Sequence, residues 1–259
     1  MFSLKDKVAI ITGGSSGIGA AAARRFCTAG AKVIIAARHD ATALAQEIGA
    51  TFIRTDVTVE KDVQTLMDSA AERFGQIDIL LNNAGSFDGF GSIEAITAED
   101  MSRLFAINTI GPFFGMKYAA AHMRSGSVII NTSSLAGLSG VPEYSAYAAS
   151  KFALNGLTLC AAIEFGPRGI RVNAICPPSV NTPMLAQSAT AEVEAALTRT
   201  TSTLNRIIEP EEVAALMHFL ASEDCPTFTG QLIRLDAGMN AGYSIAMCGA
   251  IASAAGFAG

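Results

Sequence analysis

A tyrosine and a lysine four residues apart, Tyr147 and Lys151, are the residues of this chain best suited to acid–base chemistry. On one helix, residues at this spacing lie on the same face, so the ammonium can sit near the phenol. A free phenol has a pKa of about 10, and lowering it to about 7 takes roughly 4 kcal/mol of differential stabilisation, which a nearby cation in a partly dry pocket can supply. The pair therefore predicts a tyrosine that exchanges a proton at neutral pH, as interconversion of an alcohol and a carbonyl requires.

A glycine-rich turn near the N-terminus, residues 12–19 (TGGSSGIG), is the second feature with a chemical use. It ends a predicted strand and opens a predicted helix, which is the context that dinucleotide binding requires. Its spacing differs from the usual GxGxxG, but the physics is the same. Gly13 permits a tight turn, Gly17 lets a cofactor backbone come close, and Gly19 lets the helix pack near the sheet. The exposed amides at the helix start favour a pyrophosphate, and a glycine-rich turn without a ligand is the alternative.

The elements that must position these residues alternate between short β-branched runs and alanine-rich helical stretches. Strands are expected over 8–12, 32–37, 51–55, 77–81, 127–132, 171–175 and 231–235. Helices are expected over 17–29, 41–48, 60–74, 101–123, 147–165 and 210–220. Because the strands are continuous apolar runs without alternation, they predict a parallel sheet that is buried on both faces.

The repeated strand–helix units predict an α/β fold: a doubly wound, parallel, seven-stranded sheet with helices on both faces, in a single domain over residues 1–259. The longest irregular stretch, about 177–203, follows a strand, where ligands of such sheets bind. It is therefore a candidate lid, with a substrate-side loop at about 183–205. The tail over about 240–259 is left without a role, although packing on the body or on a neighbouring subunit is favoured over a membrane anchor.

Three further strand ends offer contacts to a dinucleotide. Arg38 stands where an acidic residue usually binds a ribose 2′-hydroxyl, so it favours a 2′-phosphate and hence NADP, while Asp40 keeps NAD possible. Asp56 and Val57 follow the third strand, where the carboxylate can accept from the adenine amino group or serve as a turn residue. Residues 82–85 (NNAG) follow the fourth, where small residues let the backbone approach the adenosine ribose and Asn side chains brace neighbouring strands.

Composition excludes several classes of function. The net charge is −5 and no run of Lys or Arg is present, so nucleic acid is not the expected partner. No stretch reaches about 20 uninterrupted apolar residues, so no membrane span is expected. The five cysteines and three histidines show no metal-ligand spacing, which predicts reduced thiols in a cytoplasmic protein and no metal site.

These features together resemble the short-chain dehydrogenase/reductase family, in its compact single-domain, Rossmann-like branch. The resemblance runs from about residue 5 to residue 238. Four motifs occur in the order and at the spacings of that family: TGGSSGIG, NNAG, the pair Ser133-Ser134 after the fifth strand, and Tyr-x-x-x-Lys.

The resemblance implies four catalytic roles. Tyr147 would be the general acid in reduction and the base in oxidation. Lys151 would lower the pKa of Tyr147 and bind the nicotinamide ribose. Ser134 would hold the substrate oxygen, since the family spacing to the tyrosine selects it over Ser133. Asn108 would keep a water that links Lys151 to solvent, although a helix Asn bonded to backbone and a plain loop hydroxyl at residue 134 stay open as alternatives.

The resemblance also implies a set of cofactor contacts. They are Gly13, Ser15, Ser16, Gly17, Ile18, Gly19, Arg38, Asp56, Val57, Asn83, Ala84, Gly85, Tyr147, Lys151, Pro177, Val180 and Thr182. Two positions depart from the family pattern: Pro178 and Ala237 each stand where glycine is usual.

The function implied is an oxidoreductase that transfers a hydride between NADP or NAD and a secondary alcohol or ketone. The alternative is a catalytically inactive nucleotide-binding sensor or scaffold of the same fold. The resemblance implies a homo-oligomer, a dimer or tetramer formed through the long helices. A mostly apolar substrate pocket is expected, which favours a neutral substrate of modest size; its lining would be Ser86, Phe87, Leu135, Val141, Tyr144, Met184 and Leu185.

Overall fold

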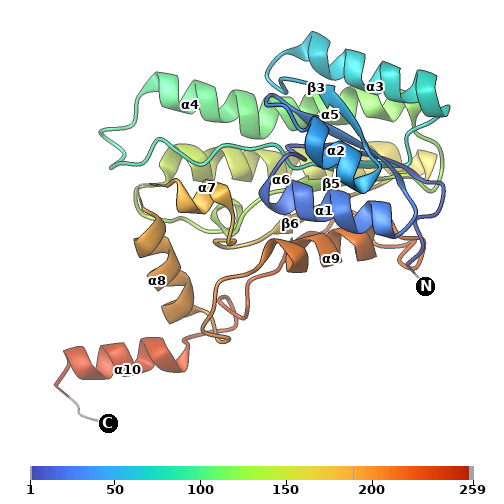
Figure 1. Ribbon diagram of the computed structural model, residues 1–259. Helices are drawn as coiled ribbons and strands as arrows, with labels where there is room; N and C mark the ends of the chain where they lie inside the picture. Colours follow the sequence, from blue (N-terminus) through green and yellow to red (C-terminus); the bar gives the residue numbers. More distant parts are fainter. Residues whose placement is uncertain (1, 189, 257–259) are drawn as a thin grey trace.

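A computed structural model describes residues 2–188 and 190–256 of the chain. Within these residues, seven strands form one parallel sheet in the order β3-β2-β1-β4-β5-β6-β7 (Figure 1). The strands are β1 (Val8–Thr12), β2 (Lys32–Ala37), β3 (Thr51–Arg54), β4 (Ile79–Asn82), β5 (Val128–Thr132), β6 (Arg171–Cys176) and β7 (Leu232–Arg234). The predicted doubly wound α/β fold is confirmed, and the strand order reverses between β1 and β4, where a crevice for ligands opens.

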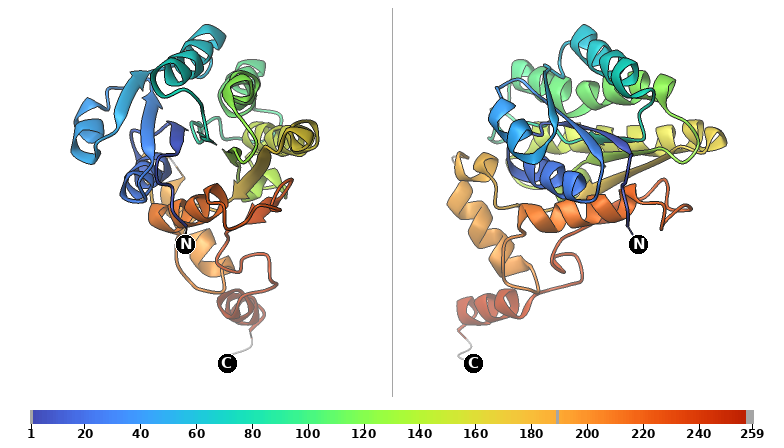
Figure 2. Two further views of the ribbon diagram at one scale, coloured as in Figure 1. Left: turned by 90° about the vertical axis from the view of Figure 1, so that its right-hand side faces the viewer. Right: turned by 45° about the vertical axis from the view of Figure 1, so that its right-hand side comes forward.

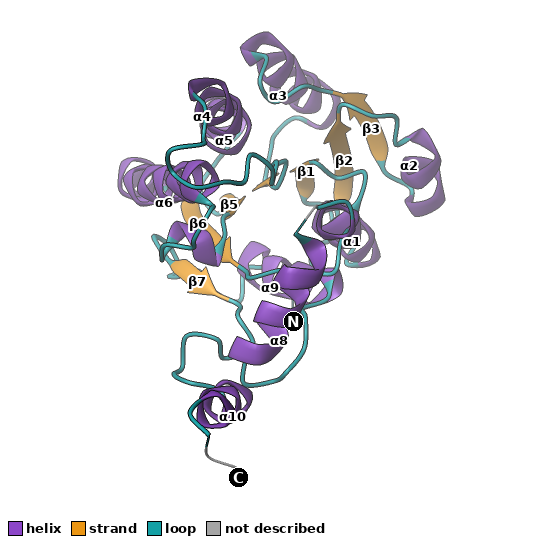
Figure 3. Ribbon diagram, turned by 90° about the vertical axis from the view of Figure 1, so that its left-hand side faces the viewer, coloured by secondary structure: helices purple, strands orange, loops and turns teal. Residues whose placement is uncertain are grey.

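Helices cover both faces of the sheet (Figures 2 and 3). They are α1 (Gly17–Thr28), α2 (Thr42–Ile48), α3 (Glu60–Phe74), α4 (Ala98–Phe105), α5 (Gly111–Ala119), α6 (Ser145–Phe165), α7 (Pro183–Ala186), α8 (Ala191–Thr201), α9 (Pro210–Ala221) and α10 (Ile245–Ala254). Short η segments join some of them: η1 (Ala106–Ile110), η2 (Ala120–His122), η3 (Leu135–Gly137) and η4 (Gly166–Arg168).

The two faces of the sheet carry separate apolar cores. Ile11 of β1 belongs to the core that α1 and α9 close, whereas its neighbour Ile10 belongs to the core that α3, α5 and α6 close. Successive side chains of a strand point to opposite faces, and both of these faces are covered. That is why the strands of this chain are apolar at consecutive positions and not at alternate ones.

The helix predicted over 101–123 is longer at its start and is interrupted. It begins at Ala98, three residues earlier than predicted, because Thr97 and Asp100 form a capping box. Its middle, η1, is a π-helical segment that leads into α5. Pro112 has no N–H to donate to the carbonyl four residues back, at Asn108, so the regular α-helical ladder cannot continue there.

The stretch over 177–203 was predicted to be irregular, and that prediction is wrong. It contains α7 and α8, which stand together beyond one end of the sheet (Figure 1). Helix α8 leaves Val193 and Leu197 exposed and buries Glu194 and Thr198. Since its buried face is polar, its sequence lacks the apolar periodicity by which a core-facing helix is recognised.

The tail contains α10, which lies beside α8 and extends away from the sheet (Figure 1). Ser244 caps the helix by accepting from the backbone N–H of Met247 at 3.0 Å. Every residue of α10, all of it within the described part of the chain, is at least partly exposed, and Ile245 is 92% exposed. Among the described residues, no helix combines the length and the apolar character needed to cross a membrane.

Candidate active site

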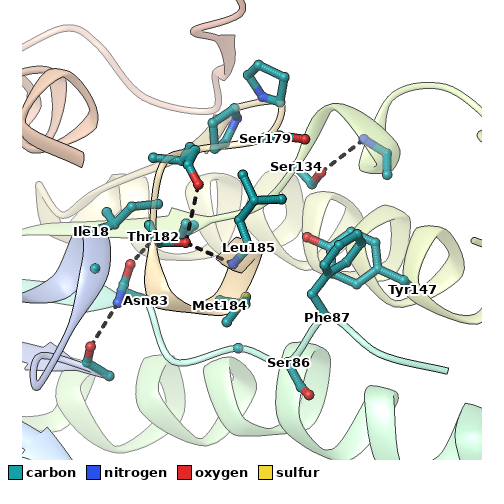
Figure 4. A pocket seen from close by; sticks show the side chains of 18 of the residues that line it. Ile18, Asn83, Ser86, Phe87, Ser134, Tyr147, Ser179, Thr182, Met184 and Leu185 are labelled. Atoms are coloured by element: carbon teal, nitrogen blue, oxygen red, sulfur yellow. Dashed lines mark hydrogen bonds between the residues drawn. The ribbon is translucent and has the colours of Figure 1, made fainter. Parts of the chain in front are cut away.

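A cavity of about 370 Å³ lies beyond the carboxyl ends of the strands and joins the glycine-rich turn to Tyr147. Figure 4 shows Ile18, Asn83 and Thr182 at one end of it, which we call the cofactor end. Ser134, Phe87 and Tyr147 lie at the other, which we call the substrate end, with Leu185 of α7 between them. Of the predicted site residues, the cavity is lined by Gly13, Ser15, Ser16, Gly17, Ile18, Arg38, Asn83, Ala84, Gly85, Ser134, Tyr147, Lys151, Pro177, Val180 and Thr182.

Four predicted site residues do not line this cavity: Gly19, Asp56, Val57 and Asn108. Gly19 lies directly beneath the turn, where an added Cβ would come within 2.2 Å of the Gly13 carbonyl oxygen. Val57 packs instead against Gly111 of α5, whose Cβ position is 3.1 Å from the Val57 side chain. These residues support the lining without forming it.

Tyr147 and Lys151 lie one helical turn apart on α6, and both side chains reach the cavity. Lys151 is only 4% exposed, and its Nζ donates to the Thr132 carbonyl at 2.9 Å. The same Nζ lies 5.7 Å from the centre of the Tyr147 ring. The geometry therefore brings an ammonium and a phenol together within the cavity, as their spacing in the sequence predicts.

The electrostatic part of that prediction is wrong for the chain by itself. Burial raises the pKa of Tyr147 to about 12, although a hydrogen bond with Ser134 works against the rise. Burial also lowers the pKa of Lys151 to about 8. Burial is the largest cause of both shifts, because the charged form of each group loses the solvation that it has in water.

Ser133 and Ser134 have different partners. The Ser133 hydroxyl donates to the Lys151 carbonyl at 3.4 Å, so it ties the end of β5 to α6. The Ser134 hydroxyl accepts from the Ala136 N–H at 3.1 Å and caps η3. In that contact the oxygen is only an acceptor, so its proton can be donated to the Tyr147 oxygen or to a ligand.

Asn108 is fully buried in η1 and joins three elements. Its Oδ1 accepts from the Ser86 N–H at 2.9 Å, and its Nδ2 donates to the Ser86 carbonyl at 3.0 Å and to the Ser150 hydroxyl at 3.1 Å. The side chain thus fixes the loop after β4 against α6. The alternative of a helix Asn bonded to backbone is confirmed by its contacts with Ser86, while its role in keeping a water beside Lys151 stays a prediction.

The glycine-rich turn is tightly packed and opens onto the first turn of α1. Gly13 and Gly17 have φ values of +65° and +51°, a region that side chains rarely adopt. A Cβ on Gly13 would lie 2.8 Å from the Ala84 Cα, and one on Gly17 would lie 3.1 Å from the Thr182 methyl group. The N-cap of α1, Ser16, makes no side-chain capping bond, so the first amides of the helix are left for a ligand.

The asparagines after β4 brace the sheet as predicted. Asn83 Nδ2 donates to the carbonyls of Thr12 and Gly13 at 3.2 and 3.3 Å. The Thr12 hydroxyl in turn accepts from the backbone N–H groups of Asn83 and Ala84 at 3.0 and 3.1 Å. Asn82 extends the brace to the next strand by donating to Asn131 at 2.9 Å. These bonds tie the ends of β1 and β4 together across the floor of the crevice.

Arg38 lines the cofactor end, whereas the two acidic residues near it are used locally. Asp40 accepts from the Thr42 N–H at 3.0 Å, and Asp56 accepts from the Thr58 N–H at 2.9 Å. Burial works to raise the pKa of Asp56, but hydrogen bonds from Thr58 and the nearby charge of Arg38 hold it below its usual value. Arg38 is thus the one charged residue among the predicted adenosine contacts that faces the cavity within the described residues.

The substrate end has an aromatic wall. Phe87 packs edge-on against Tyr147 and Tyr144, with ring centres 4.8 and 5.3 Å away, and Phe90 lies behind it at 4.6 Å. All seven residues predicted for the substrate pocket line the cavity. The prediction missed its contributions from other segments: Pro178, Ser179, Glu194, Leu197, Thr198 and Met239.

The buried acid Glu194 is the most consequential of the missed residues. It comes from α8, which the sequence pattern does not predict, so no face could be assigned to its side chain from the sequence. The only usable signal was two glutamates in one turn of a helix that carries few charges elsewhere, and this pattern is equally typical of a solvated face.

Comparisons with known proteins find a matching family profile, similar proteins and a similar crystal structure. A family profile described as enoyl-(acyl carrier protein) reductase matches residues 13–240. The chain is 40% identical to momilactone A synthase of Oryza sativa subsp. japonica, over 92% of this chain and 91% of that protein. It is 37% identical to trans-4-hydroxycyclohexanecarboxylate dehydrogenase of Sinomonas cyclohexanicum, over 93% and 95% of the two chains. The crystal structure of a dehydrogenase/reductase from Sinorhizobium meliloti 1021 superposes with a TM-score of 0.86 at 34% identity and covers 92% of this chain and 97% of its own.

Proposed function

The chain belongs to the short-chain dehydrogenase/reductase family of NAD(P)-dependent oxidoreductases that act on CH–OH groups, and we propose that it interconverts a secondary alcohol and a ketone. The observation that carries this proposal is that one cavity has the glycine-rich turn at one end and the buried pair Tyr147 and Lys151 at the other. A nicotinamide cofactor, when bound, would supply the hydride chemistry. Both groups needed to move the proton are present, so nothing favours an inactive scaffold.

Tyr147 is the proposed acid and base. In reduction its Oη donates a proton to the carbonyl oxygen of the substrate, and in oxidation it takes the proton back from the hydroxyl. Burial in the aromatic wall keeps this phenol neutral in the chain by itself, since its pKa is raised to about 12. The charge that the proton leaves behind must therefore be stabilised from within the site.

Lys151 and Ser134 supply that stabilisation in the proposed reaction. With its pKa at about 8, Lys151 is mostly cationic at neutral pH despite its burial. Its Nζ is held by the Thr132 carbonyl and can place two further donors towards the ribose and the phenol. In the proposed reaction Ser134 donates its proton to the substrate oxygen, where charge develops, since its contact with the Ala136 N–H uses only its oxygen.

Asn108 is proposed to act as a positioning residue. It fixes the loop that carries Ser86 and Phe87 and, through Ser150, the helical turn that carries Tyr147 and Lys151. It makes no direct contact with the cavity, so its effect on the reaction would come through the placement of these neighbours.

The proposed cofactor is NADP, with NAD as the alternative. The residues that would hold it are those of the glycine-rich turn, the NNAG segment and the Pro177–Thr182 segment, together with Arg38. The nearby acid that could favour a ribose 2′-hydroxyl, Asp40, is engaged by Thr42. A guanidinium left facing the cavity suits a 2′-phosphate.

The chain is also proposed to form a homo-oligomer, a dimer or a tetramer. Ile110 and Phe113 of the η1–α5 segment and Phe152, Leu159 and Ile163 of α6 are exposed apolar side chains. Large exposed apolar residues on neighbouring helices suit a two-fold contact between copies. The five cysteines are free in this structure, which supports the proposal of a reducing, cytoplasmic compartment.

The test is turnover measured at the absorbance band of reduced nicotinamide, with a panel of cyclic and open-chain ketones and alcohols. We expect oxidation of NADPH by at least one neutral ketone, at a higher initial rate than with NADH. Arg38→Ala should reduce the NADPH rate by about tenfold and leave the NADH rate nearly unchanged. Tight cofactor binding without turnover of any ketone or alcohol would instead favour the scaffold.

A further inference from the structure

A buried carboxylate stands in the wall of the substrate end. Glu194 projects from α8, is only 5% exposed and lines the same cavity as Tyr147 and Ser134. The other acid in the first turn of this helix, Glu192, is exposed. Two glutamates two residues apart thus have opposite environments, and only one of them faces the cavity.

The partners of Glu194 are neutral hydroxyl groups. Ser179 donates to Oε2 at 3.2 Å, while Ser188 and Thr190 donate to Oε1 at 3.4 and 2.5 Å. No lysine, arginine or histidine of the described residues forms an ion pair with it. The hydroxyls hold the carboxylate in place, but they do not neutralise its charge.

A carboxylate has room for about four hydrogen bonds. Besides the serine and threonine donors, a hydrogen bond between Tyr144 and Glu194 contributes, after burial, to raising the pKa of Tyr144. These partners are all neutral, so a ligand whose donor group reached Glu194 would form a charge-assisted hydrogen bond in a partly dry cavity. The charge of Glu194 also contributes to raising the pKa values of Tyr144 and Tyr147, after burial, which places the carboxylate within electrostatic reach of both phenols.

We propose that Glu194 is a specificity-determining residue that accepts a hydrogen bond from a donor group of the substrate, a hydroxyl or an ammonium, located away from the reacting carbon. This inference rests on the proposed function of the same cavity. It modifies the expected substrate from a simple neutral ketone to one with an apolar ring or chain for the aromatic wall and a polar donor for Glu194. The polar end would then orient the reacting carbon towards Tyr147.

The test compares three alcohols of one shape at saturating cofactor: cyclohexanol, trans-1,4-cyclohexanediol and trans-4-aminocyclohexanol. The readout is the ratio of kcat/KM for each donor-bearing alcohol to that for cyclohexanol. It is measured for the wild type, for Glu194→Leu and Glu194→Gln, and for the matched control Glu192→Leu on the same helix.

The wild type should prefer at least one donor-bearing alcohol by about tenfold or more, which is the size of one charge-assisted hydrogen bond. Glu194→Leu should bring this ratio to about one, and Glu192→Leu should leave it unchanged. With Glu194→Gln, a preference for the diol should fall by about threefold, while a preference for the amino alcohol should vanish, so the two kinds of donor are distinguished. Should Glu194→Leu fail to fold, the change in the kcat/KM ratio in Glu194→Gln tests the proposal.

Equal kcat/KM for all three alcohols in the wild type would overturn the inference, and so would a ratio that survives in the Glu194 variants. A purely structural role would lower all three values together and leave the ratio as it was, which is the second of these outcomes. Turnover of cyclohexanol alone would leave the proposed function standing, whereas no turnover of any alcohol would count against the proposed function itself.

Discussion

The two ends of the cavity are built from different materials. At the cofactor end, the lining is mostly backbone, held by positive-φ glycines and by the Thr12–Asn83 bonds across the floor. At the substrate end, it is mostly side chains, which come from α6, from the loop after β4, and from α7 and α8. A surface of backbone suits a cofactor that is the same for many substrates. A surface of side chains can be altered by single substitutions without disturbing the sheet.

The two ends of the cavity also differ in how well they tolerate substitutions. An added methyl group at Gly19 would meet backbone that cannot move aside, because the atom in its way is the carbonyl oxygen of Gly13. At the substrate end, side chains such as Met184 and Phe87 can change rotamer to accommodate a substitution. Four substitutions test this comparison, in order of decreasing expected effect.

Tyr147→Phe should separate the two ends most strongly. It removes the proposed acid while it preserves the ring that packs against Phe87, so kcat should fall by about 10² to 10⁴-fold. Cofactor affinity, measured by fluorescence titration, should change by no more than about threefold. Turnover near the wild-type rate would place the acid elsewhere in the cavity.

Gly19→Ala should damage the cofactor end. The new Cβ would lie 2.2 Å from the Gly13 oxygen, and the turn must shift to admit it. We expect a loss of up to about 3 kcal/mol in the free energy of unfolding and a weaker affinity for the cofactor. Gly249→Ala is the matched control, because that glycine is also helical, in α10, and has open space around its Cβ position. It should be neutral or stabilise by up to about 1 kcal/mol, and equal effects of the two changes would contradict the packing argument.

Lys151→Met should remove a pH dependence of stability. Below pH 8 the lysine is charged in both the folded and the unfolded chain, so the fold bears the full cost of burying the ammonium. Between the folded pKa of about 8 and the unfolded value of 10.5, the lysine is neutral only in the fold, so stability rises with pH. The free energy of unfolding of the wild type, relative to that of the variant, should rise by about 2 kcal/mol between pH 7 and 9.5 in urea unfolding.

The comparison with the variant is needed because burial raises the pKa values of the Cys27, Cys176 and Cys225 thiols, which lowers the stability of both proteins with rising pH in this window. The opposite contribution of Tyr147 begins only above its unfolded pKa of about 10, because the unfolded phenol ionises there while the buried one does not. A difference between wild type and variant that stays flat from pH 7 to 9.5 would mean that the ammonium is not buried as the structure has it.

Ala237→Gly should have the smallest effect. Ala237 has a φ of +51° at a position where the sequence resembles a glycine motif, and its carbonyl accepts from the Thr203 hydroxyl at 2.9 Å. The left-handed conformation costs an alanine about 1 kcal/mol, part of which glycine loses again through the entropy of the unfolded chain. Thermal unfolding should show a gain of a few degrees at most, and a lower melting temperature would show that the strain is compensated.

The sequence was most informative where local geometry decides the structure. Residues 12–19 and 82–85 could be placed because a tight turn at a strand end admits few residue types, and the strands because both faces of a parallel sheet must be apolar. The π-helical segment at Asn108 could not be placed, because it depends on how Pro112 and the packing against α6 divide the hydrogen bonds of one helix. Helix α8 and Glu194 were missed because a polar buried face gives no periodic signal.

The electrostatics of Tyr147 show a second limit. The spacing of Tyr147 and Lys151 correctly predicts a shared face, but spacing says nothing about the cost of desolvation. That cost raises the pKa of the phenol to about 12 and lowers the pKa of the ammonium to about 8. The reaction therefore depends on how far a bound cofactor and substrate change these two pKa values.

The central claim is that Tyr147 becomes an effective acid and base when the cofactor end is filled. The most direct measurement is the pH dependence of kcat/KM for alcohol oxidation at saturating cofactor, which reports the ionisation of the cofactor-bound enzyme before it binds the alcohol. We expect kcat/KM to rise with pH to a plateau governed by one apparent pKa below about 9, about three units under the value of about 12 for the chain by itself. A steady rise to pH 10 without a plateau would contradict the account, because the phenol would then never have left its buried, neutral state.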